Sequence, residues 1–193
     1  MEKDFDIEIR VDSVVISGYV NVCCRDSRII KDSKNNEFVE QVRMGTWKKA
    51  IEENDYILLL LNHDSEKIIT STKENLKLKE DNIGLFAEVT IYDSNIIQKA
   101  KAKELVGWSF GFKCNKSSWG KTDYGVSRRY LDDIYLYEVS ILDNTRIPAY
   151  IGTSICANEE LDKIKDTKEP QGTKNTILSE LILIELANIK RKF

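Results

Sequence analysis

The alternation of apolar and polar residues predicts a chain built mainly of β-strands. Residues 6–22 alternate and are rich in Val and Ile, which indicates one or two strands. Polar turns separate the strand-like stretches that follow. These stretches cover residues 37–43, 56–61, 67–78, 84–91, 107–112, 127–142 and 151–157. The second of them is apolar throughout, as is typical of a strand covered on both faces.

Two short helices are expected between these strands. Thr46 is a candidate N-cap for a helix over residues 46–54. Ser94 is the corresponding candidate for a helix over residues 95–106, and Gly107 would end it. Strands and helices segregated in this way predict a β-rich α+β fold.

The chain of 193 residues is long enough for one domain with a real core and an appendage. We place the domain at residues 1–157. Residues 158–174 are charged and contain Pro170 and Gly172, which indicates a linker. Residues 175–193 repeat apolar positions at helical spacing and predict a C-terminal amphipathic helix.

Composition narrows the function classes. The formal net charge is -3 and the basic residues are scattered, so we expect no nucleic-acid partner. The longest apolar run is far too short for a bilayer, so we expect no membrane partner. The four cysteines form no C-x-x-C pair and there is a single histidine, so neither a metal site nor a cofactor is expected. The charged N-terminus and the cysteine usage suggest an intracellular protein with reduced thiols.

The sequence around Ser109 suggests a catalytic serine. If residues 107–112 are extended, the aromatic residues among them share one face, and Ser109 shares the other with Gly107 and Gly111. A peptide could approach this face closely because glycine has no Cβ. Ser109 is therefore the candidate nucleophile.

A serine nucleophile needs a base, and His63 is the only histidine in the chain. It follows a buried apolar strand, a good place for a rigid catalytic group. Glu138 is the candidate third member, because a carboxylate among apolar neighbours needs a partner. Asp64 competes for this role, but adjacent strand residues point apart. Simple alternation would place Glu138 and Ser140 on one face with Ile134 and Leu136, and Tyr135, Tyr137, Val139 and Ile141 on the other.

Structural interpretations of the same residues remain open at this point. A lone histidine is more often structural, and a serine between glycines can mark a bulge. Glu138 could pair with Arg128, Arg129 or Arg146 instead of His63. Cys114 is an alternative nucleophile, although nothing near it in sequence would activate it. A β-barrel binding module with an incidental histidine and serine fits composition and spacing as well.

Seven short motifs, in this order, resemble the prohead (capsid maturation) proteases of tailed bacteriophages, of the type found in phage HK97. They are Gly18-Tyr19, Glu40 with Gly45, Leu60-Leu61-Asn62-His63-Asp64, Gly84-Leu85, Trp108-Ser109-Phe110-Gly111-Phe112, Tyr137-Glu138-Val139-Ser140-Ile141 and Pro148-Ala149-Tyr150. The resemblance covers about residues 7–157, and the blocks around His63 and Ser109 are its most specific parts.

The resemblance implies a serine endopeptidase related in fold to the herpesvirus assemblins, a β-barrel wrapped by a few helices. The family's histidine falls on His63 and its serine on Ser109. Herpesvirus enzymes use a second histidine, which this chain lacks, so the third role passes to Glu138. Either Arg146 or a backbone N–H would stabilise the oxyanion.

The same resemblance places the enzyme in the host cytoplasm, inside the viral procapsid. Its partner would be the major capsid protein precursor, whose scaffolding segment it removes, and it would also cleave itself. Residues 158–174 suit self-processing because proteases cut exposed, flexible segments. The helix over residues 175–193 would bind scaffold or a second protease subunit, in a homo-oligomer. The alternative is a non-catalytic capsid assembly or scaffold protein that retains the protease fold.

Overall fold

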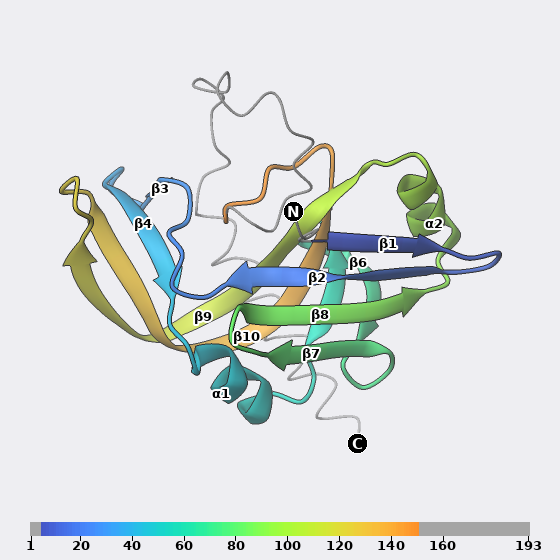
Figure 1. Ribbon diagram of the computed structural model, residues 1–193, viewed down its shortest axis with the longest axis horizontal. Helices are drawn as coiled ribbons and strands as arrows, with labels where there is room; N and C mark the ends of the chain where they lie inside the picture. Colours follow the sequence, from blue (N-terminus) through green and yellow to red (C-terminus); the bar gives the residue numbers. More distant parts are fainter. Residues whose placement is uncertain (1–4, 151–193) are drawn as a thin grey trace.

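The described part of the chain forms two β-sheets and two short helices (Figure 1). The computed structural model describes residues 5–150. Its elements are β1 (Phe5–Ile9), β2 (Val14–Val22), β3 (Ile30–Lys31), β4 (Glu37–Val42), α1 (Thr46–Glu53), β5 (Leu58–Leu61), β6 (Asp64–Ser71), β7 (Leu76–Glu80), β8 (Gly84–Ile91), α2 (Ser94–Lys101), β9 (Leu105–Lys121) and β10 (Ser127–Asp143). The β-rich α+β class is confirmed for this part of the chain.

The second sheet is organised around the long strand β10. The first sheet is antiparallel throughout, in the order β1-β2-β8-β7. In the second, β9 pairs antiparallel with β10 along almost its whole length. On the other edge of β10, β4 and then β5 pair with it in parallel, and β3 and β6 extend these two strands outward. Strands far apart in sequence therefore meet on β10.

The two sheets do not close into a barrel within residues 5–150, because each keeps its own hydrogen-bonded path. The expected barrel wrapped by helices is thus not what the described strands form. The main core lies between the sheets and includes Ile16 and Leu85 from the first and Trp108 and Val139 from the second. The predicted strand over 151–157, linker over 158–174 and helix over 175–193 lie outside the described residues.

Both helix caps differ from expectation. Helix α1 has Gly45 at its N-cap with φ 86° and no side-chain cap of its own. Glu80 of β7 accepts hydrogen bonds from the N–H groups of Gly45 and Lys48, both at 2.6 Å. Thr46, the expected cap, instead donates its hydroxyl to the carbonyl of Leu131 at 3.1 Å. A carboxylate distant in sequence supplies the cap here.

Helix α2 begins and ends earlier than predicted. Its N-cap is Asp93, whose carboxylate accepts from the N–H groups of Asn95 and Ile96. Ser94, the expected cap, is the first helical residue. The helix ends at Lys101, and Gly107, the expected stop, lies inside β9. Neither described helix is both long and apolar enough to cross a membrane.

Two strand predictions also change. The single strand expected over 67–78 is two strands, because β6 ends at Ser71 and a turn precedes β7. In β10, Leu136 pairs with Phe112 and Glu138 with Gly111, so Tyr137 is an extra residue at a β-bulge.

The bulge changes which residues of β10 share a face. The main core contains Ile134, Leu136, Val139 and Ile141, whereas Tyr137 packs in a separate cluster with Leu58 and Leu60. The predicted grouping of Glu138 with Ile134 and Leu136 is therefore wrong. Glu138 lies between Tyr137 and Val139 and faces away from the main core.

Candidate active site

Ser109 lies on β9 with the surroundings that the alternation predicted. Trp108 and Phe110 are buried in the main core, and Ser109 is partly exposed on the opposite face. It pairs with Ser140 of β10, the strand around which the second sheet is organised. The hydroxyl is therefore fixed on a rigid element and reachable from outside.

His63 lies in a tight turn between β5 and β6. Leu61 pairs with Asp64, so Asn62 and His63 form a two-residue hairpin loop. Both have positive φ, 58° and 60°, the combination of a type I′ turn. Asn tolerates this conformation, but for His it costs on the order of 1–3 kcal/mol. Such strain persists only where surrounding contacts hold it in place.

Those contacts come from β10. The N–H of Asn62 donates to the carbonyl of Ile141 at 2.9 Å, and the N–H of His63 donates to Ser140 Oγ at 3.1 Å. The N–H of Asp143 donates in turn to Asn62 Oδ1 at 3.0 Å. The turn is thus tied to three residues near the end of one strand, Ser140, Ile141 and Asp143.

Glu138 is completely buried, and its carboxylate is bonded on both oxygens. Oε1 lies 2.6 Å from His63 Nδ1, and Oε2 accepts from Ser140 Oγ at 2.7 Å. Gly111 leaves the space for it, since a Cβ there would collide with Oε1. The partner that burial of this carboxylate requires is therefore His63.

The three predicted side chains form one chain of hydrogen bonds. His63 Nε2 lies 2.8 Å from Ser109 Oγ, and Nδ1 faces Glu138 on the other side of the ring. With the proton on Nδ1, His63 donates to Glu138 and accepts from the hydroxyl of Ser109. This arrangement can move a proton from Ser109 to His63.

The electrostatics of His63 are dominated by opposing effects. Burial favours the neutral ring and is the largest influence, but the negative charge of Glu138 and its hydrogen bond together outweigh it. The pKa of His63 is therefore raised above its ordinary value, although the nearby positive charge of Arg146 counteracts this. The imidazolium that a base must become is stabilised at this position.

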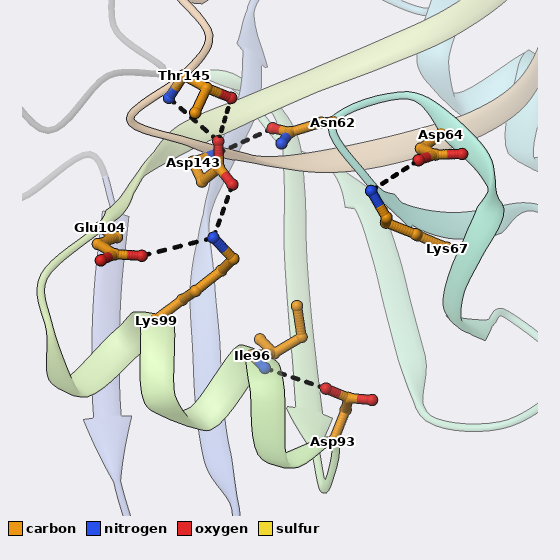
Figure 2. A network of polar contacts seen from close by, with 9 residues as sticks. All are labelled: Asn62, Asp64, Lys67, Asp93, Ile96, Lys99, Glu104, Asp143 and Thr145. Atoms are coloured by element: carbon orange, nitrogen blue, oxygen red, sulfur yellow. Dashed lines mark hydrogen bonds and ion pairs between the residues drawn. The ribbon is translucent and has the colours of Figure 1, made fainter.

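Asp64, the competing third member, is directed elsewhere. Its carboxylate lies 2.9 Å from Lys67 Nζ, as Figure 2 shows, and it accepts from the N–H of Glu66. The Lys67 ammonium holds the pKa of Asp64 below its usual range. Two of the three arginines that could have paired with Glu138 have other partners, because Arg128 binds Asp26 and Arg129 binds Glu40.

A second polar network supports the turn from the end of β10 (Figure 2). The buried carboxylate of Asp143 accepts from Lys99 Nζ of α2 at 2.9 Å and from the hydroxyl of Thr145 at 2.6 Å. Burial raises its pKa, but hydrogen bonds from Thr145, Lys99 and Asn62 outweigh this and hold it well below its usual range. Sequence reasoning did not assign Asp143 or Ser140 a role at the site. The sequence feature that could have identified them is that both are polar residues near the end of a long apolar strand.

The remaining candidates are placed as follows. Arg146 is exposed, its backbone N–H donates to the carbonyl of Asp143 at 3.0 Å, and the positive charge of its guanidinium acts on His63. Cys114 is partly buried against the edge of the main core. Within residues 5–150, no three His, Cys, Asp or Glu side chains gather as a metal ion would require.

Comparison with known proteins agrees with this geometry. The family model described as caudovirus prohead serine protease matches residues 3–169. The search of curated proteins returned no match. Because the family match covers most of the chain, the protein belongs to the caudovirus prohead serine proteases, a family of capsid maturation proteases that act in the viral procapsid.

Proposed function

We propose that this chain is a serine endopeptidase in which Ser109 is the nucleophile, His63 the general base and Glu138 the group that orients His63. The observation that supports this most strongly is the continuous path of hydrogen bonds, 2.8 Å from Ser109 Oγ to His63 Nε2 and 2.6 Å from His63 Nδ1 to Glu138. Membership of a serine protease family supports the same assignment.

The proposed reaction proceeds by acyl transfer. Ser109 Oγ attacks the peptide carbonyl carbon while its proton moves to His63 Nε2. His63 then gives this proton to the departing amine, which leaves an ester on Ser109. Water attacks the ester and loses a proton to His63, which passes this proton to Ser109 Oγ as the acid is released. The guanidinium of Arg146 is our candidate for stabilising the oxyanion, because its positive charge is close enough to act on His63, and a backbone N–H is the alternative.

The substrate we propose is the scaffolding segment of the major capsid protein precursor, with self-cleavage within residues 158–174. The hydroxyl of Ser109 is partly exposed and can meet a substrate carbonyl. The open strip of glycine backbone expected beside it does not form, because Gly107 and Gly111 are buried and the carboxylate of Glu138 fills the space beside Gly111. We further propose that the chain acts in the host cytoplasm inside the procapsid, and that residues 175–193 bind scaffold or a second subunit.

Co-expression of the full-length chain with the major capsid protein precursor of its phage tests this proposal. Mass spectrometry should show a shortened capsid protein with the wild type and an intact precursor with Ser109→Ala. Ser117→Ala is the matched control, an exposed serine of the same strand, and should cleave normally. Cleavage by Ser109→Ala would overturn the nucleophile assignment, and an intact precursor with every variant would favour the non-catalytic assembly protein.

A further inference from the structure

Ser140 occupies a central position between the proposed catalytic groups. It pairs with Ser109 on β9 and with Leu60 on β5, so neighbours flank it on both edges. Its side chain is fully buried. A buried hydroxyl in an apolar strand needs partners of its own.

Both partners of this hydroxyl belong to the proposed proton relay. Ser140 donates to Oε2 of Glu138 at 2.7 Å and accepts from the N–H of His63 at 3.1 Å. A serine hydroxyl has one proton to donate, so this pair of bonds sets its orientation. The same atom therefore contacts the carboxylate that orients His63 and the backbone of His63.

We propose that Ser140 is a positioning residue that holds Glu138 and the backbone of His63 in register, an inference that rests on the function proposed above. Glu138 is confined on one side by Gly111, where a Cβ would not fit, and on the other by the hydroxyl of Ser140. The backbone of His63 is in a left-handed conformation that needs external support. One hydroxyl supplies both constraints.

This role has a consequence for pH dependence. Without this bond the carboxylate of Glu138 is held less firmly against His63 Nδ1, so its influence in raising the pKa of His63 weakens. The base then becomes neutral at lower pH. A hydroxyl that only stabilises the fold would leave the midpoint of the pH profile unchanged.

Ser140→Ala in the full-length chain tests the proposal, with a fluorophosphonate as probe. In the labelling reaction Ser109 Oγ bonds to phosphorus, fluoride leaves and His63 takes the serine proton. We expect the maximal labelling rate to fall by about 10²-fold, as for a misplaced catalytic group. Probe affinity should stay within about twofold of wild type, because Ser140 is buried, and the acid limb should move to lower pH.

Thr46→Val is the matched control, because it removes another buried hydroxyl bonded to β10 but far from the relay. It should leave the pH midpoint and the labelling rate unchanged. If Ser140→Ala does not fold, Ser140→Cys replaces it; its weaker donor should shift the midpoint in the same direction by less.

A wild-type rate and midpoint in the folded Ser140 variant would overturn this inference while leaving the proposed function intact. If Ser109→Ala were also labelled as fast as wild type, the proposed function itself would fail.

Discussion

Gly111→Ala tests the position of Glu138 without substituting any residue of the proposed relay. A Cβ on residue 111 would overlap Oε1 of Glu138 and lie 3.1 Å from its Cδ and Cγ. The carboxylate must move by about 1 Å to reach ordinary van der Waals separation. The 2.6 Å contact with His63 Nδ1 then exceeds hydrogen-bonding range.

The expected result has two parts. Displacement of a catalytic group by ~1 Å costs about 10²-fold in rate, equivalent to about 2.7 kcal/mol of transition-state stabilisation. The wild-type rate should rise with pH through the pKa of His63, above the ordinary ~6.5 because Glu138 raises it. In Gly111→Ala this influence weakens, so the acid limb should move to lower pH, the same direction as expected for Ser140→Ala.

Fluorophosphonate labelling of Ser109 measured between pH 5 and pH 9 is the assay, with thermal unfolding alongside it. Gly120→Ala is the control, because it makes the same substitution on the same strand and its Cβ would meet only Tyr130, at 3.1 Å. An unchanged rate and an unchanged midpoint in folded Gly111→Ala would refute the assignment of Glu138 as the orienting group.

Two further predictions concern stability. Glu80→Ala should lower the free energy of unfolding by about 1 kcal/mol, because α1 loses its cap. Glu88→Ala is the control, because it removes only an exposed ion pair with Lys77 and should change the free energy of unfolding little. Equal losses for the two variants in urea titrations would contradict the capping role. Asp143→Asn should lower the free energy of unfolding at pH 7 by about 1–3 kcal/mol, because its hydrogen-bonded carboxylate is buried. The pKa of Asp143 is lower in the folded than in the unfolded state, so its contribution to stability is present above the unfolded pKa and is lost as the pH falls. The difference in free energy of unfolding between wild type and Asp143→Asn should therefore narrow below about pH 4. A difference that stays constant with pH would contradict this role of the ionised carboxylate.

The strands were predictable because apolar alternation is a local signal, whereas the details that failed depend on distant partners. Thr46 looked like a cap because capping residues are normally adjacent to the helix, but Glu80 reaches α1 from another strand. The bulge at Tyr137 adds one residue without changing the composition of β10, so alternation alone assigned Glu138 to the wrong face.

The candidate site was accessible from sequence for a different reason. With one histidine in the chain, any serine–histidine pair had to include His63, which left few combinations. Ser140 and Asp143, which support the site, could not be singled out in this way, because serine and aspartate are common near strand ends. The Asn62–His63 turn also lacked the glycine that usually marks a two-residue hairpin.

The order of the strands along the chain bears on when the enzyme can first act. Ser109 and His63 are synthesised before β10, but Glu138 and Ser140 arrive with it, and β5 pairs with β10 across about 80 residues of chain. While β10 is still inside the ribosome, β5 and β9 lack the strand with which both of them pair, so His63 and Ser109 are not yet held together. Translation itself therefore delays proteolytic competence until almost the whole described fold has emerged.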